Sequence, residues 1–300
     1  MGKSGAKLSG NMRGAAWMLL SAASFTVMAV CIKLLAEQEY SEGQMLFFRA
    51  AVGIILLAPI TMRSGLSVWR TPRPWNMARR VGASALGVLL SYYAFANMPL
   101  ATAQSLSFAR ALFVVLLAML LLRERVGIWR QSALAAGFVG IMVMLRPTEM
   151  QFNLAAFAAL ASAASLAYSI VTIKDLTRDH STLSLVLWMN AGTTVLALPF
   201  AFFGWRTPGL WDAGIFVLLA VSGVVAQSAF TRGLATGDAS FVTLMDYVRL
   251  PMTALAGYIL FQERVDVWTV LGAMIVIVST VFITLREAYL DKRRAPPPPG

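Results

Sequence analysis

Three charged side chains lie well inside long apolar stretches of this sequence: Arg110, Asp246 and Arg249. A charge within a membrane span costs about 2.5–3.5 kcal/mol on insertion scales, so such residues are functional candidates by default. Asp246 precedes Arg249 by three positions, which puts both on one face of a helix. Two guanidinium groups and one carboxylate leave one net positive charge, which could receive the carboxylate of a ligand. The same groups could instead form a structural ion-pair network between two helices.

Polar and aromatic side chains in similar apolar stretches form a second set of candidates. Aromatic rings can stack on a planar ligand while their polar atoms orient it, but Trp and Tyr also gather at membrane interfaces. Hydroxyl and amide groups can hydrogen-bond a ligand or a neighbouring helix. Beyond the three charged residues, we predict substrate contacts for Trp17, Tyr92, Gln104, Ser107, Tyr168, Gln227 and Thr243. Arg49, near one end of its apolar stretch, is expected to snorkel to the interface rather than enter a cavity.

The rest of the residue inventory argues against catalysis and bound cofactors. The chain contains one cysteine, Cys31, and one histidine, His180, so it can form neither an internal disulfide nor a zinc site built on clustered histidines. It has no G-x-x-x-x-G-K-[S/T] phosphate-binding loop. An intramembrane enzyme needs paired acids, clustered histidines or a Ser/Lys dyad. We therefore expect no metal, no cofactor and no enzymatic activity.

The composition places these candidates in a lipid bilayer. Of the 300 residues, 58% are hydrophobic and 13% are charged, against about 45–50% and about 25% in soluble domains. A hydrocarbon core about 30 Å thick is crossed by roughly 20 apolar residues in a helix. The sequence accordingly predicts an all-α integral membrane protein with ten transmembrane helices. The predicted spans are 14–35, 44–62, 81–98, 100–122, 128–145, 154–174, 183–203, 211–231, 239–261 and 266–285.

The distribution of basic residues predicts the orientation of these helices. The N-terminus, the even-numbered loops with the adjoining helix ends, and the C-terminal tail hold 18 of the 25 Lys and Arg residues, and the other loops with their adjoining helix ends hold four. Basic residues concentrate on the cytoplasmic side of membrane proteins. Both termini are therefore predicted to be cytoplasmic, and the net charge of +11 needs no nucleic-acid partner to explain it.

The sequence also contains an internal repeat. Shifts of 141 and 139 residues align the second half with the first, and each half has five predicted helices. An odd number of helices makes the second copy enter the membrane from the opposite side, which is the inverted-repeat arrangement of many secondary transporters. The expected repeats are 14–145 and 154–285, followed by a disordered cytoplasmic tail at 286–300. The matched positions include Lys33 with Lys174, Arg110 with Arg249, and Glu124-Arg125-Val126 with Glu263-Arg264-Val265.

These features resemble the drug/metabolite transporter superfamily, EamA type. Leu-Ala-Thr-Ala-Gln-Ser-Leu-Ser (100–107) and Gly-Asp-Ala-Ser-Phe-Val-Thr-Leu (237–244) resemble the start of that family's fourth and ninth helices. Leu-Arg-Glu-Arg (122–125) and Phe-Gln-Glu-Arg (261–264) match its helix-ending turns. The resemblance implies a basket-like bundle in a bacterial inner membrane, with a central cavity lined mainly by helices 1, 3, 4, 6, 8 and 9. The family includes amino-acid exporters and carriers of riboflavin-like or nucleoside-like metabolites.

The sequence therefore predicts a secondary active transporter of small organic metabolites that works by alternating access. An exporter of amino acids, aromatic ones in particular, is the leading interpretation, because the candidate residues combine aromatic rings with a net positive charge. The alternative is a carrier, for uptake or export, of a planar vitamin or nucleoside-like metabolite such as riboflavin or S-adenosylmethionine. Asp246 is a candidate site for a coupling proton. A monomer and a homodimer are both compatible with the sequence.

Overall fold

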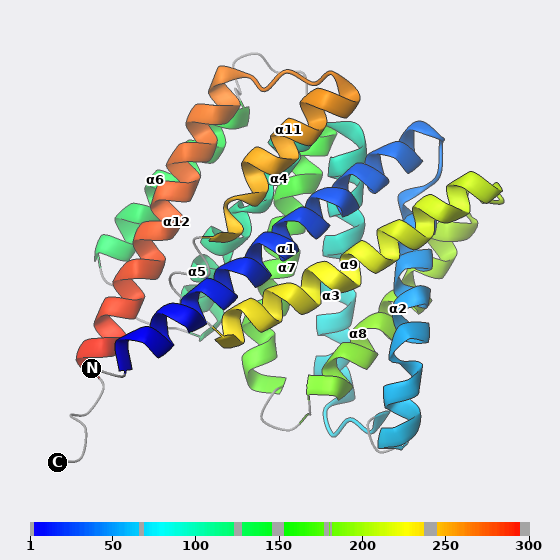
Figure 1. Cartoon of the computed structure of the whole chain (residues 1–300), viewed down its shortest axis with the longest axis horizontal. Helices are drawn as coiled ribbons and strands as arrows, with labels where there is room; N and C mark the ends of the chain where they lie inside the picture. Colours follow the sequence, from blue (N-terminus) through cyan, green and yellow to red (C-terminus); the bar gives the residue numbers. More distant parts are fainter. Residues whose placement is uncertain are drawn as a thin grey trace.

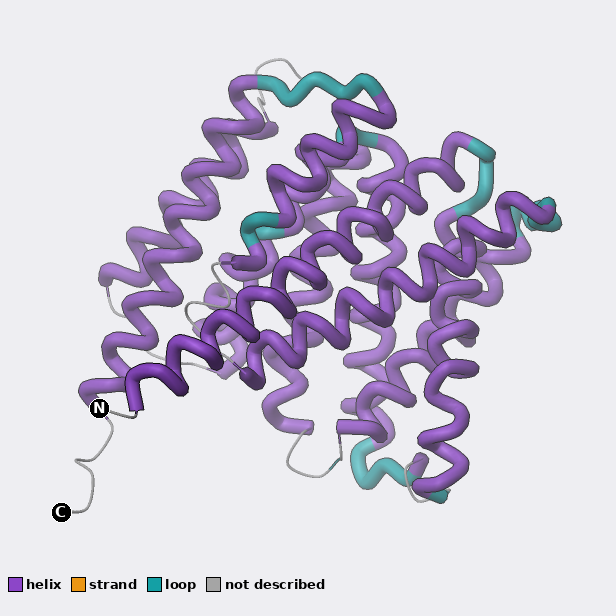
Figure 2. Tube along the Cα trace, viewed as in Figure 1, coloured by secondary structure: helices purple, strands orange, loops and turns teal. Residues whose placement is uncertain are grey.

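The chain folds into a bundle of α-helices, and the described residues contain no strand (Figure 2). The computed structural model describes residues 3–65, 69–122, 128–145, 153–176, 180, 182–236 and 245–294. The helices of these segments are α1 (Lys3–Glu37), α2 (Glu42–Ser64), α3 (Pro74–Asn97), α4 (Leu100–Ser107), α5 (Ala109–Leu122), α6 (Ile128–Leu145), α7 (Leu154–Leu176), α8 (Thr182–Phe202), α9 (Leu210–Thr236), α11 (Arg249–Phe261) and α12 (Val267–Arg294).

The helices occupy the predicted membrane spans. Within the described residues, six segments are long and apolar enough to cross a bilayer: Met12–Glu37, Leu100–Leu121, Leu154–Thr172, Ser184–Phe202, Leu210–Gly233 and Val267–Arg286. Two shorter apolar helices, Gln131–Leu145 and Arg249–Phe261, lie in the fifth and ninth predicted spans. Helices α2 and α3 cover the second and third. The all-helical membrane fold predicted from the sequence is therefore confirmed.

The contacts between helices follow a twofold pattern that relates the two halves of the chain. The first helix of each half packs on the third helix of the other half, as α1 with α9 and α7 with α3. The second helices pack on each other (α2 with α8), as do the fifth helices (α6 with α12). Figure 1 shows α1 and α9 crossing the bundle together, with α6 and α12 paired at one edge. The bundle is thus built from two five-helix repeats of opposite orientation.

The α6–α12 pair shows how closely these helices approach. A Cβ atom added to Gly272 would lie 2.5 Å from the carbonyl oxygen of Gly140, and one added to Gly140 would lie 2.8 Å from that of Gly272. Small residues allow helix backbones to meet in this way, and tight packing replaces the hydrophobic driving force that is missing within lipid. The two repeats are therefore joined at this edge by direct backbone contact.

Two spans predicted as continuous helices are interrupted near their middle. In the fourth span the chain turns at Phe108, whose N–H bonds to the carbonyl oxygen of Ser105 at 3.2 Å, one residue tighter than an α-helix. In the ninth span the Val248 N–H bonds to the carbonyl oxygen of Met245 at 3.2 Å, and α11 begins at the next residue. Because Phe108 and Tyr247 are separated by the repeat shift of 139, the two interruptions occupy equivalent positions.

The tail is helical further than the sequence predicts, and two prolines lie within helices without ending them. Pro199 lies inside α8, and Pro251 lies in the first turn of α11, where the missing N–H breaks no helical hydrogen bond. Helix α12 continues to Arg294, so residues 286–294 of the predicted disordered tail are helical. The first of the tail prolines is Pro296, which leaves good helix formers up to Arg294. Residues 295–300 lie outside the described part of the chain.

Candidate functional site

The two interrupted spans place the predicted charged residues at the same depth. Arg110 is the second residue of α5 and Arg249 is the first residue of α11, each 12 residues before the end of its helix. At 1.5 Å per residue this distance is about 18 Å, more than half of a hydrocarbon core about 30 Å thick. The interruptions therefore hold both guanidinium groups near the middle of the bundle's span.

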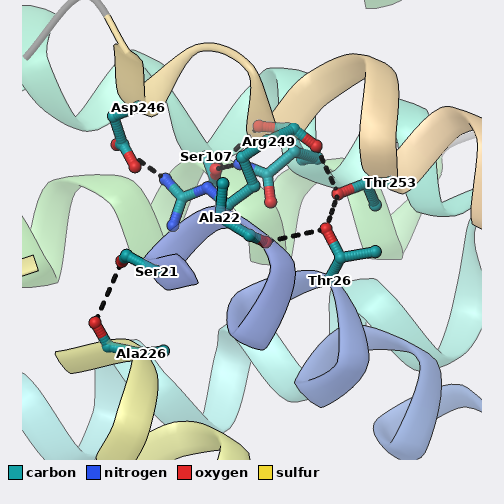
Figure 3. Close-up of polar contacts among 9 residues, drawn as sticks. Ser21, Ala22, Thr26, Ser107, Ala226, Asp246, Arg249 and Thr253 are labelled. Carbon is teal, nitrogen blue, oxygen red and sulfur yellow. Dashed lines mark hydrogen bonds and ion pairs between the residues drawn. The ribbon is translucent and has the colours of Figure 1, made fainter. Parts of the chain in front are cut away.

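Asp246 and Arg249 form the ion pair that their spacing predicts. Nη2 of Arg249 donates to Oδ2 of Asp246 at 3.1 Å, and the two residues are only 6% and 8% exposed (Figure 3). Each partner also keeps an unused polar atom, because Oδ1 of Asp246 and Nε of Arg249 are buried with no hydrogen bond within the described segments. Buried polar atoms are usually satisfied, so two unsatisfied atoms in one pair suggest a place where a ligand binds.

Arg110 approaches this pair without joining it. The charges of Arg249 and Asp246 both act on the Arg110 guanidinium. No hydrogen bond or ion pair of Arg110 is found among the described residues, and its side chain is only partly buried. Among the described residues, Asp246 therefore pairs with Arg249, while its charge also acts on a second guanidinium, that of Arg110.

Aromatic rings surround the charged centre. The guanidinium carbon of Arg249 lies 4.6 Å from the ring centroid of Phe25 and 5.4 Å from that of Phe108, which favours a cation through the ring quadrupole. The rings of Phe108 and Tyr247 contact each other with centroids 4.8 Å apart. The residues at the two helix interruptions therefore meet beside the ion pair. Sequence reasoning missed Phe25 and Phe108, although the repeat pairs Phe108 with Tyr247.

Two threonines hold α11 against α1 next to this centre. Oγ1 of Thr253 donates to the carbonyl oxygen of Arg249 at 2.7 Å and lies 3.3 Å from Oγ1 of Thr26 (Figure 3). Oγ1 of Thr26 lies 2.9 Å from the carbonyl oxygen of Ala22. One turn away along α1, Ser21 donates to the carbonyl oxygen of Ala226 on α9 at 2.9 Å. These bonds fix the backbone that carries Arg249.

The structure brings two more predicted residues to the centre. Ser107 is the last residue of α4 and directly precedes Phe108, whose ring contacts the Arg249 guanidinium. Its Oγ donates to the carbonyl oxygen of Gln104 at 2.6 Å and lies 2.9 Å from Nε2 of the same residue. Gln104 is 3% exposed, so its amide can reach a ligand only at the interior of the bundle. Thr243, also predicted to contact the substrate, lies outside the described residues.

Other predicted residues lie away from this centre. The Arg232 guanidinium, near the end of α9, lies 5.0 Å from the ring centroid of Trp17 on α1. The Tyr168 hydroxyl accepts a hydrogen bond of 2.9 Å from the exposed Arg79 near the start of α3. Gln227 is exposed on α9, and no described contact links its side chain to the charged centre. These three residues therefore do not join the central cluster here.

Arg49 does not lie where the sequence predicted. Its Nε lies 3.0 Å from the position of a Cβ on Gly223, so the side chain crosses α9 at a residue without a side chain. Sδ of Met28 on α1 borders the same glycine, and the guanidinium interacts with the Tyr92 hydroxyl on α3. Arg49 thus points among α1, α3 and α9 rather than towards the interface.

A polar cluster that the sequence did not suggest joins four segments at one end of the bundle. Nζ of Lys33 on α1 forms an ion pair with Oε1 of Glu263 and donates to the carbonyl oxygen of Met98 at 3.1 Å. Oε2 of Glu263 accepts the N–H of Leu100, the first residue of α4, at 2.7 Å. A negative group is favoured at a helix N-terminus. The internal repeat carried a signal for this cluster, because both Lys33 and Glu263 have repeat counterparts.

The comparison with known families agrees with this architecture. The EamA-like transporter family matches residues 12–146 and again residues 153–285. The chain belongs to the EamA-like transporter family. The double match corresponds to the two halves of the bundle, and it makes the chain a multi-pass membrane protein of a transporter family. A solved crystal structure shares this fold, with a TM-score of 0.59 and 18% identity over 93% of this chain and 98% of that one.

Relatives within the family are named for different substrates. The chain is 30% identical to an S-adenosylmethionine uptake transporter of Rickettsia prowazekii, over 92% of this chain and 94% of that one. It is 29% identical to a riboflavin transporter of Rhizobium johnstonii, over 94% of each chain. It is 26% identical to a pseudopaline exporter of Pseudomonas aeruginosa, over 89% of this chain and 94% of that one. The relatives are thus named as transporters and not as enzymes, and their names include both uptake and export.

Proposed function

We propose that this chain is a secondary carrier for small metabolites that contain an α-amino-carboxylate group, and that the charged centre binds this group. The observation that carries the proposal is the Asp246–Arg249 pair, whose buried Oδ1 and Nε atoms have no partner among the described residues. The charge of the same carboxylate also acts on the Arg110 guanidinium, which has no ion pair among the described residues. A zwitterion would supply one charge of each sign to these unused groups.

Each part of such a ligand has a matching group at the centre. Its carboxylate would accept hydrogen bonds from Arg110 and from Nε of Arg249, since guanidinium–carboxylate contacts are among the stronger hydrogen bonds in proteins. Its ammonium group would donate to Oδ1 of Asp246. An aromatic or other planar portion would contact the Phe25, Phe108 and Tyr247 rings. Binding would satisfy buried polar atoms that otherwise lower the stability of the fold.

Alternating access would move this bound group between the two sides of the membrane. Inverted repeats support a rocking motion around a site at the repeat interface, near the bilayer midplane. The cluster of Lys33, Glu263 and Leu100 would close one end of the path, and the positive-inside pattern of the loops assigns that end to the outside. The cell inner membrane is the proposed location, with both termini in the cytoplasm.

Amino acids, aromatic ones in particular, are the leading substrates in this proposal. S-adenosylmethionine fits the same chemistry, because it joins an amino-acid group to a planar purine, and a relative at 30% identity is named for its uptake. Riboflavin, named for another relative, has no amino-carboxylate group and would use the aromatic rings alone. Export of amino acids is the direction predicted from the sequence. Asp246 stays the candidate for a coupling proton.

A thermal-shift screen followed by transport assays tests this proposal. A true ligand stabilises the purified chain in detergent by mass action, so amino acids, S-adenosylmethionine, flavins and nucleosides are compared. Solutes that stabilise the chain are then tested for influx and efflux in proteoliposomes. We expect saturable transport of a zwitterion, and its loss in Arg110→Ala and Arg249→Ala variants that still fold. Unchanged transport in both variants, or stabilisation by neutral solutes alone, would refute the proposed binding mode.

A further inference from the structure

Arg80, near the start of α3, carries a buried charge that no described residue neutralises. The residue is 6% exposed, and its Nε and Nη1 atoms are buried without a hydrogen bond in the part of the chain that the structure describes. No hydrogen bond or charge of another described residue offsets the burial of its guanidinium. Nη2 is not among these fully buried atoms and has no described partner either, so the guanidinium keeps one edge at the surface.

Arg80 does not behave as a snorkelling side chain. Its neighbour Arg79 does, because it is exposed and its Nη2 donates to the Tyr168 hydroxyl at 2.9 Å. Arg80 lies on the buried face of α3, which it shares with Met77 and Val81 at helical spacing. Buried charges are normally paired, since an unpaired one is costly. An anion from outside the chain would supply the missing partner.

The contact between α3 and α8 holds a second unused donor. A Cβ on Gly192 would collide with the side chain of Val81, so the two helices meet closely one residue after Arg80. Trp188, one turn before Gly192 on α8, packs against the cluster that contains Met77 and Val81. Its indole Nε1 is buried and makes no hydrogen bond within the described segments. Both unused groups donate, so an anion is the acceptor that suits this contact.

Arg80 lies at the depth of the lipid head groups. From Arg80 to Asn97, the last residue of α3, the helix rises about 26 Å. The next residue is Met98, whose carbonyl oxygen accepts from Lys33 at the opposite end of the bundle. A hydrocarbon core is about 30 Å thick, so Arg80 lies at its border on the other side. Trp75, five residues earlier, is 72% exposed, as expected for a tryptophan in an interfacial belt.

The segment around Arg80 is strongly basic. Residues 63–80 contain five arginines and no acidic residue. The proposed orientation places this end of the bundle in the cytoplasm, and the cytoplasmic leaflet has a negative surface potential. Basic pockets between transmembrane helices on that side bind phospholipid head groups. The charge of this segment is therefore complementary to an anionic lipid.

The internal repeat argues against a purely structural role for the charge at residue 80. Shifts of 139 and 141 residues place the apolar Leu219 and Val221 at the equivalent position in the second half. In both halves this third helix packs on the first helix of the other half. Such packing therefore needs no cation at this position.

We propose that Arg80 binds the phosphate of an anionic phospholipid where α3 meets α8. The phosphate oxygens accept hydrogen bonds from the Arg80 guanidinium, and the head group also supplies an acceptor for the Trp188 N–H. The exposed guanidinium of Arg79 adds to the attraction. The bound lipid anchors the start of α3 in its leaflet. This site is separate from the charged centre, and from the proposed function it takes only the orientation of the bundle.

Phosphatidylglycerol and phosphatidylcholine test this site, because both carry a phosphate and only the first has a net negative charge. The full chain in neutral detergent is titrated with each lipid, and binding is read from the thermal shift. Arg80→Gln is compared with Arg70→Gln, which removes the same charge from an exposed position of the basic segment. We expect phosphatidylglycerol to stabilise wild type and Arg70→Gln alike, and more than phosphatidylcholine does. Arg80→Gln should weaken phosphatidylglycerol binding about tenfold or more, the effect of losing a hydrogen bond to a charged group.

Arg80→Lys keeps the test decisive if Arg80→Gln does not fold. This change keeps a positive charge at residue 80 but replaces the planar fork of five donors with a single ammonium group. It should weaken phosphatidylglycerol binding about three- to tenfold, the effect of one lost hydrogen bond, whereas Arg70→Lys should leave binding unchanged.

Three results would overturn the site. The first is equal stabilisation by the two lipids. The second is an equal effect of Arg70→Gln and Arg80→Gln on phosphatidylglycerol binding, which would indicate diffuse attraction to the basic segment. The third is stabilisation through Arg80 by inorganic phosphate as strong as that by the lipid, which would indicate a site for a free anion. None of these results depends on measuring transport, so failure of this site is distinguishable from failure of the proposed function.

Discussion

Neutralising Glu263 should open the end of the bundle that we propose the Lys33 cluster closes. The Glu263 carboxylate accepts from Lys33 and from the Leu100 N–H, and the two charged side chains are only 14% and 11% exposed. Glu263→Gln keeps an acceptor for Leu100 but removes the charge that pairs with Lys33. A hydrogen bond to a charged group contributes about 1.5–3 kcal/mol. Since 1.4 kcal/mol is a factor of ten, the open population should rise about 10- to 150-fold.

Labelling of a single cysteine measures this change. Cys31→Ser removes the chain's one cysteine, and Ser107→Cys places a thiol next to Phe108, whose ring contacts Arg249. A membrane-impermeant maleimide applied to intact cells then reports opening towards the outside, and we expect much faster labelling with Glu263→Gln. Glu39→Gln is the matched control, because Glu39 is 86% exposed and its ion pair with Arg206 is worth about 0–1 kcal/mol. Equal labelling rates for Glu263→Gln, Glu39→Gln and the parent would refute the closing role of the cluster.

Two further predictions concern the same end of the bundle. Gly257→Ala would place a Cβ 2.5 Å from Oε2 of Glu263, so it should speed labelling as Glu263→Gln does. Gly82→Ala is the control, because no atom lies within 4 Å of its added Cβ, and it should leave the labelling rate unchanged. Burial raises the pKa of Tyr40 from 10.0, and its hydrogen bond to Asp212 at 2.7 Å adds to the rise. The folded chain stabilises the protonated phenol of Tyr40. Its contribution to the free energy of unfolding is therefore complete below pH 10 and is lost as the pH rises through the raised pKa. Thermal melts of wild type and Tyr40→Phe should therefore differ by a constant amount up to about pH 10 and converge above it; convergence at neutral pH would contradict this.

Much of the fold could be predicted from the sequence because lipid imposes a simple rule. Only a helix or a closed barrel satisfies its own backbone in hydrocarbon, so each long apolar stretch had to be helical. The helix interruption at Phe108 could not be predicted in this way, since no glycine or proline marks it. In the second half the interruption lies at Met245–Val248, before Pro251, so the proline does not mark it either. Tertiary packing therefore decides where these spans are interrupted.

The sequence predicted those site residues whose charges are costly to bury in a membrane. It could not predict the direction in which a long side chain points. The free-energy cost of burying their charges identified Arg249 and Asp246 as candidates, and their spacing of three residues predicted the ion pair. Arg49 was assigned to the interface because its position along α2 allows snorkelling, and sequence position alone does not say which way a long side chain points. The Lys33–Glu263 contact joins residues 230 positions apart, so only the folded chain shows that they meet.

Binding of a zwitterion and its carboxylate-blocked form tests the central claim most directly. Arg110 makes no hydrogen bond or ion pair among the described residues, so Arg110→Gln should leave the fold intact while removing a carboxylate partner. The solute that best stabilises the chain is titrated alongside its methyl ester against wild type and Arg110→Gln. We expect wild type to prefer the free carboxylate about tenfold or more and Arg110→Gln to lose most of this preference. An equal preference in both proteins would contradict it.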